Sequence, residues 1–174
     1  FTLGQSLTRI GIVGFSTVAR VLSPLSVSRD ELHRSIETYR ASGWTSISRG
    51  IDAAAALPVR LPRHWAASLP LATLPPARVV MMVLTDGEQN AHLGGAAYAV
   101  KAATDAKAAG TTLFAVGFGG AKRETLNAMA SAPAEHYAYR GASPAEVTRH
   151  FRDFCSAVAS PRVPPPPPSH PLPP

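Results

Sequence analysis

The sequence has little cysteine and no long apolar run. The first shortage limits the cysteine chemistry open to the chain, and the second argues against a membrane span. Its only cysteine is Cys155, which we expect to be either a small buried hydrophobe or half of a disulfide to a residue outside this sequence. No histidine and carboxylate are arranged around it as a nucleophile requires. No apolar stretch approaches the roughly 20 residues of a transmembrane helix, so the sequence predicts no membrane span.

Acidic residues are also scarce, with 11 Asp and Glu against 17 Lys and Arg, for a formal net charge of +6. A basic protein suggests nucleic acid as a partner. Here, however, the basic residues are scattered over separate segments, and the only local clusters are small, at Arg60 to Arg63 and at Lys122-Arg123. The pattern favours a solvated surface of mixed charge and no nucleic-acid binding.

The length of 174 residues and the proline distribution predict one folded domain and a tail. Residues 160–174 are rich in proline, with an unbroken run from Pro164 to Pro168. Such a segment favours disorder or an extended polyproline II rod. We therefore expect a domain over residues 1–159 and a tail over 160–174. The tail is interpreted first as a stiff spacer; a ligand for a proline-binding module and a hydroxyproline-rich stalk are the alternatives.

Strands and helices alternate along the domain. The pattern predicts strands over residues 9–15, 18–22, 79–84, 112–117 and 136–139, the first two forming an antiparallel pair. It predicts helices over about 28–40, 46–57, 95–109 and 122–129, and a last helix that begins at Ser143-Pro144. Leu32, Ile36 and Tyr39 should share the core face of the first helix, and residues 58–76 should form a surface loop. This order predicts an α/β fold with a doubly wound, mostly parallel central sheet and helices on both faces.

The clearest functional signal lies at the end of the strand over residues 79–84. That strand is apolar at every position, which indicates burial on both faces. It is followed at once by Thr85-Asp86-Gly87-Glu88. In open α/β sheets, ligands bind in the crevice beyond the carboxyl ends of the strands. A carboxylate at Asp86 beside a hydroxyl and a tight glycine turn therefore suggests a site for a hard cation.

Other polar or bulky residues near this signal are given structural interpretations. Glu88 is expected to begin the solvated loop, and His92 to lie on the surface; the remaining histidines show no metal-ligand spacing. The glycines from Gly117 to Gly120 fit a strand-to-helix turn rather than a nucleotide fingerprint. Trp44 is either an anchor for a partner or a core residue.

Several segments, taken in order, resemble a von Willebrand factor type A domain over about residues 1–159. They are residues 9–17, 43–48, 79–90, 108–120, 126–131 and 136–139, followed by an apolar helix that ends near Cys155. The resemblance implies a non-enzymatic protein-binding module with a metal-ion-dependent adhesion site. It implies Thr45 and Asp86 as metal ligands, Mg²⁺ or another divalent cation as cofactor, and an acidic side chain of a protein partner as a further ligand.

The sequence departs from this family because it contains no Asp-x-Ser-x-Ser segment, which should follow the first strand. Pro24 and Trp44 stand where the aspartate should precede two serine pairs of the right spacing. Only eight residues precede the strand that begins at Arg9, so we expect the first strand and most of the first helix to be absent. Truncation is the favoured explanation, and loss of the motif is the alternative. With two of five ligand positions, Mg²⁺ should bind weakly or not at all.

Two classes of function remain after these observations. The first is an adhesion or protein-binding module at the cell surface or outside the cell. The alternative is an intracellular subunit of a chelatase-like, ATPase-linked complex in the cytoplasm or an organelle. A hydrolase is disfavoured because the sequence contains no nucleophile elbow.

Overall fold

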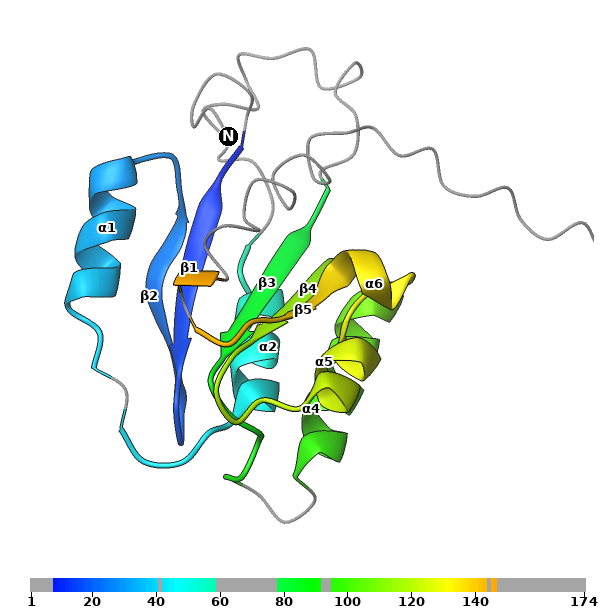
Figure 1. The fold of residues 1–174 in the computed structure, drawn as a ribbon. Coiled ribbons are helices and arrows are strands. Elements are labelled where there is room, and N and C mark those ends of the chain that lie inside the picture. Colours follow the sequence, from blue (N-terminus) through cyan, green and yellow to red (C-terminus); the bar gives the residue numbers. More distant parts are fainter. Residues whose placement is uncertain (1–7, 41, 59–77, 92–94, 144, 147–174) are drawn as a thin grey trace, which may run out of the picture.

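The computed structural model describes residues 8–40, 42–58, 78–91, 95–143 and 145–146. The elements follow in the order β1 (Ile10–Phe15), β2 (Ala19–Ser26), α1 (Arg29–Glu37), α2 (Ile47–Ala55), β3 (Val80–Thr85), α4 (Ala96–Ala108), β4 (Thr112–Gly117), α5 (Arg123–Met129), α6 (Ala134–Tyr137) and β5 (Ala138–Arg140) (Figure 1). The predicted loop over residues 58–76 falls almost wholly outside the described residues. Most of the last helix, Cys155 and the tail lie outside them entirely.

The strands form two sheets. The strands β1 and β2 are antiparallel, as predicted. The strands β3, β4 and β5 form a parallel sheet in that order, with Val80 opposite Thr112 and Ala115 opposite Ala138. Within the described residues, no ladder joins β1 to β3. The predicted parallel sheet is thus confirmed for β3, β4 and β5, whereas β1 and β2 form a separate pair.

Helix α2 packs against both sheets and so connects them, as Figure 1 shows. Its neighbours α4 and α5 complete one layer over β3 and β4. Small side chains make this close packing possible, because α4 buries four alanines, Ala99, Ala102, Ala103 and Ala106. The core residues are Ile47, Ile51, Met81, Val83, Ala99, Ala102, Ala103, Ala106, Leu113, Ala115, Ala121, Leu126, Met129 and Ala130.

The pair β1–β2 is covered on both faces. A Cβ on Gly50 of α2 would lie 2.6 Å from the Phe15 ring, and a Cβ on Gly14 would lie 2.6 Å from the Tyr39 ring. Since successive residues of a strand point to opposite faces, α2 lies on one face and the segment after α1 on the other. Ile36 was wrongly predicted to face the core: it is 58% exposed, because α1 ends at Glu37 and packs through Leu32.

Strand β3 is not buried on both faces, which corrects the prediction. Met81, Val83 and Thr85 are buried, but Val80 is 36% and Leu84 is 44% exposed. The physical reason is one-sided packing: the buried residues face α2 and the alanines of α4, and no element of the described chain covers the other face.

The predicted strand over residues 136–139 is displaced. Residues 134–137 form the short helix α6, and the strand β5 begins at Ala138. Edge-to-face contact of the Tyr137 and Phe114 rings, with centroids 4.8 Å apart, fixes the end of α6 over β4. Ser143 does act as a helix cap, because its Oγ accepts the Glu146 N–H. No helix among the described residues has the length and apolar character needed to cross a membrane.

Candidate metal centre and binding face

Thr45 lies in the loop that enters α2, and the turn between β1 and β2 fixes this loop. The backbone N–H of Trp44 donates to Thr17 Oγ1 at 2.9 Å, and the backbone N–H of Ser46 donates to the Ser16 carbonyl at 2.8 Å. Gly43 has φ +86° and lies so close to Thr17 that a Cβ would collide with its hydroxyl. A glycine is therefore required before Trp44, and Thr45 is presented at the carboxyl end of β1.

Asp86 follows β3 at the same edge of the fold. The Thr85 hydroxyl closes a tight turn by bonding both backbone groups of Gly87, with O···O and N···O distances of 2.9 and 3.3 Å. Behind this turn, the Gly120 N–H donates to the Asp86 carbonyl at 2.8 Å. The Asp86 side chain is exposed. Its carboxylate accepts no hydrogen bond from any residue in the described part of the chain.

Hydrogen bonds join the Thr45 loop directly to the loop after Asp86. The Thr45 N–H donates to Asn90 Oδ1 at 2.6 Å, and the Thr45 carbonyl accepts the Asn90 and Ala91 N–H groups at 2.9 and 3.1 Å. Next to them, the Ser48 N–H donates to Gln89 Oε1 at 2.8 Å. The structure thus brings together the two loops that carry the predicted ligands. Sequence reasoning missed Gln89 and Asn90, whose only signal was their place behind the Thr-Asp-Gly-Glu turn.

Glu88 is not part of a solvated loop, which corrects the prediction. It is half-buried, and its two carboxylate oxygens accept the Lys122 N–H and the Thr125 hydroxyl, each at 2.8 Å. Lys122 is the N-cap residue of α5, and its own side chain makes no capping bond. Glu88 therefore satisfies, from a distant loop, one orphan backbone donor at the start of α5 and a hydroxyl in its first turn.

The side-chain oxygens of these two loops are of the chemical type that a hard cation binds, but there are few of them. The Asp86 carboxylate and the Thr45 hydroxyl are oxygen donors of the sort that Mg²⁺ and Mn²⁺ accept. Neither is engaged by a side chain or backbone group of the described residues. Two further polar atoms in these loops, Ser46 Oγ and Gln89 Nε2, are buried and have no partner in the described chain. Within those same residues, no group of three or more His, Cys, Asp or Glu side chains could hold a metal.

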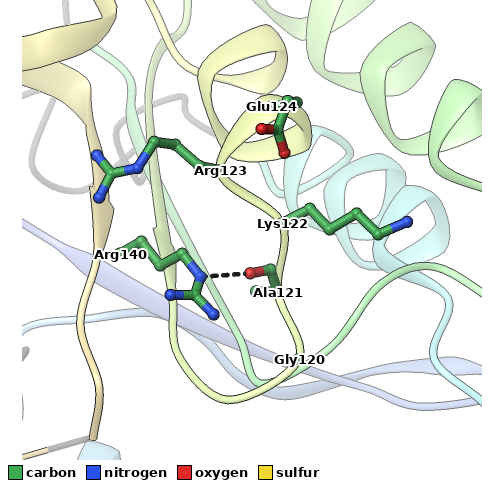
Figure 2. Close-up of a pocket in the computed structure, with 6 residues that line it drawn as sticks. All are labelled: Gly120, Ala121, Lys122, Arg123, Glu124 and Arg140. Atoms are coloured by element: carbon green, nitrogen blue, oxygen red, sulfur yellow. Dashed lines mark hydrogen bonds between the residues drawn. The ribbon is translucent and has the colours of Figure 1, made fainter.

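A shallow basic pocket of about 310 Å³ lies beside the Asp86 turn, lined by Gly120, Ala121, Lys122, Arg123, Glu124 and Arg140. Arg140 closes it: Nε donates to the Ala121 carbonyl at 2.7 Å and a terminal nitrogen to the Gly119 carbonyl at 3.0 Å. Figure 2 shows Arg123 and Arg140 extending to one side of this loop and Lys122 to the other. Gly120 belongs to both the pocket lining and the turn, because its N–H donates to the Asp86 carbonyl.

The other residues singled out in the sequence lie around this site or outside the described residues. Trp44 is 62% exposed, so it is not a core residue and stands open beside Thr45. The predicted turn from Gly117 to Gly120 is confirmed; Gly119 has φ +56°, and a Cβ there would lie 3.0 Å from the Asp86 carbonyl oxygen. His92 and Cys155 lie outside the described residues.

Comparison with known proteins identifies the family of this arrangement. The family model of the von Willebrand factor type A domain matches residues 1–153. Among curated proteins, no sequence matches the chain significantly.

Solved structures share the fold at low sequence identity. Proximal thread matrix protein 1 from the mussel byssus, with a zinc-occupied MIDAS motif, is 21% identical with a TM-score of 0.67 over 90% of this chain. The pilus adhesin SpaC from Lactobacillus rhamnosus GG is 14% identical with a TM-score of 0.64 over 86% of the chain, or 25% of SpaC. Manganese-loaded TRAP from Plasmodium vivax is 15% identical with a TM-score of 0.57 over 88% of the chain and 60% of TRAP. The chain spans 36% of the mussel protein's length.

Proposed function

Because the chain belongs to the von Willebrand factor type A domain family, we propose that it is a non-enzymatic protein-binding module with a divalent cation at Thr45 and Asp86. The observation that carries the proposal is the junction of their two loops. The hydrogen bonds between Thr45 and Asn90 hold a hydroxyl-bearing loop and a carboxylate-bearing loop at one edge of the fold. Both oxygen ligands remain available there.

The similar structures support a divalent cation. The mussel matrix protein carries zinc in its MIDAS motif, and the Plasmodium protein is loaded with manganese. In this chain the cation would be Mg²⁺ or an ion of similar preference, since the donors are hard oxygens. One carboxylate and one hydroxyl leave most of six octahedral positions to water and to the partner. Binding of the cation alone should therefore be weak.

The partner would be a protein whose acidic side chain completes the coordination. Trp44 supports a protein partner, because an exposed tryptophan next to a polar site is a typical anchor at protein interfaces. The basic pocket around Arg123 and Arg140 favours an acidic partner surface. Adhesion outside the cell is the setting that agrees with a pilus adhesin and a byssus matrix protein among the similar structures.

Titration with Mn²⁺ alone tests the proposal, by electron paramagnetic resonance of the free ion. We expect the full chain to bind only weakly, with a Kd on the order of 10⁻³ M or above, because only one charged ligand is present. Asp86→Ala should weaken binding at least about tenfold, and Thr45→Ala should weaken it less because a neutral ligand is lost. Asp105→Ala is the matched control: it removes an exposed carboxylate that pairs with Lys101 on α4. Equal affinity of Asp86→Ala and the wild type would disprove the metal site.

A further inference from the structure

Glu88 is the second carboxylate of the Asp86 turn, and its two oxygens are already committed. They bind the backbone of Lys122 and the hydroxyl of Thr125, both at 2.8 Å. Thr125 is only 8% exposed, so this contact is largely shielded from water. Charge-assisted hydrogen bonds of this kind are roughly twice as strong as neutral ones. Glu88 therefore lies where it can fix the turn but not where it can join Asp86 as a ligand.

The loop before α5 supports the same turn a second time. The Gly120 N–H donates to the Asp86 carbonyl at 2.8 Å, and the Phe118 N–H donates to the Thr85 carbonyl at 3.1 Å. Arg140 of β5 in turn holds the carbonyls of Gly119 and Ala121. The backbone of Asp86 is thus packed against a loop that is itself anchored to β5.

At its other end, the segment of residues 86–91 is hydrogen-bonded to the Thr45 loop. Asn90 bonds Thr45 and Gln89 bonds Ser48, so residues 86–91 span the space between α2 and α5. A displacement of this segment at the α5 end would move Asp86 relative to Thr45. The two ligands keep their relation only if both ends are held.

We propose that Glu88 is a positioning residue that fixes Asp86 by attaching its turn to α5, which couples cation binding to the start of that helix. The proposal rests on the proposed cation site. It explains why two carboxylates separated by one residue have different roles: one is exposed and unengaged, and the other is half-buried and bound. Residues that orient metal ligands typically contribute 10- to 100-fold to metal affinity.

Four variants distinguish a positioning role of Glu88 from an effect of its charge. Glu88→Ala removes both hydrogen bonds and should weaken Mn²⁺ binding about tenfold. Thr125→Val removes one of them without approaching the cation and should weaken it about threefold. Glu88→Gln keeps an acceptor for the Lys122 N–H and a donor for Thr125 Oγ1, so it should stay within about threefold of the wild type. Glu135→Ala is the matched control, since it removes an exposed carboxylate from the first turn of the neighbouring helix α6 and should leave the affinity unchanged.

Two patterns of affinity would overturn the proposal. If Glu88→Gln lost as much affinity as Glu88→Ala, Glu88 would act by its charge or as a ligand. If Glu135→Ala matched Glu88→Ala, general charge near the site would explain the effect.

Amide hydrogen exchange without metal provides an independent readout. Glu88→Ala should speed exchange both at Lys122 to Leu126 and at residues 86–91, and Glu88→Gln should restore protection. Faster exchange confined to α5 would contradict the proposal, because the cap would then support the helix alone. A wild type that binds no Mn²⁺ would refute the cation site, while the exchange data would still decide whether Glu88 fixes the turn.

Discussion

At the scale of single residues, polar side chains that cross between loops hold the candidate site in place. Asn90, Gln89 and Glu88 each bind backbone groups of a segment 34 to 45 residues away. Each replaces water around a backbone donor that would otherwise lack a partner. The position of Asp86 thus depends on three neighbours that are not metal ligands themselves.

A similar hydrogen bond between distant segments, far from the site, predicts an effect on the free energy of unfolding. Ser131 Oγ accepts the Leu113 N–H at 2.9 Å, and the residue Leu113 is fully buried at the start of β4. Ser131→Ala would leave that N–H without a partner, so we expect the free energy of unfolding to fall by about 1–3 kcal/mol. Urea denaturation measures this change. Ser42→Ala, at an exposed residue, should change stability by less than about 0.5 kcal/mol; a similar loss in both variants would contradict the explanation.

Sequence reasoning found the residues with local signatures and missed those with distant partners. Asp86 is conspicuous because a polar turn ends an apolar strand, and Gly43 and Thr45 fit a loop before a helix. Nothing near Glu88 in sequence indicates Thr125, which is 37 residues away. A carboxylate in a loop is usually solvated, and only the tertiary position of α5 changes that expectation here.

At the scale of elements, the periodicity of the sequence predicted those helices and strands whose position depends on residues close together in the chain. The helix predicted over residues 95–109 is confirmed as α4, and Gly110 follows it at φ +90°. The exposed face of β3 and the displacement of the last strand by α6 were not predictable in this way. Both depend on which other elements cover a surface, and an apolar run reads the same whether one face is covered or two.

The contact between α2 and β1 gives a prediction for an element pair. Gly50→Ala should raise helix propensity by about 1 kcal/mol, but its Cβ would lie 2.6 Å from the Phe15 ring. Overpacking costs about 1–3 kcal/mol, so we expect no gain and up to about 2 kcal/mol of destabilisation. Thermal and urea unfolding would measure it. The double variant Phe15→Leu with Gly50→Ala should recover part of the loss, and Gly50→Ala that stabilises the protein would refute the packing.

At the scale of the whole molecule, the proline distribution predicts where the folded unit ends. Deletion of residues 161–174 should leave the free energy of unfolding within about 0.5 kcal/mol of the full chain, because a polyproline segment buries little. Deletion of residues 151–174 is the comparison, since it also removes Phe151 and Phe154 of the predicted last helix. That loss should cost several kcal/mol. Equal stability of the full chain and the longer deletion would place the boundary before residue 151.

The division into two sheets has a mechanical consequence. In the described part of the chain, β1–β2 and β3–β4–β5 share no backbone ladder; α2 and the loop contacts between Thr45 and Asn90 hold them together. A pulling force across this boundary would meet packed side chains and a few hydrogen bonds rather than a row of them. The boundary would therefore yield before either sheet.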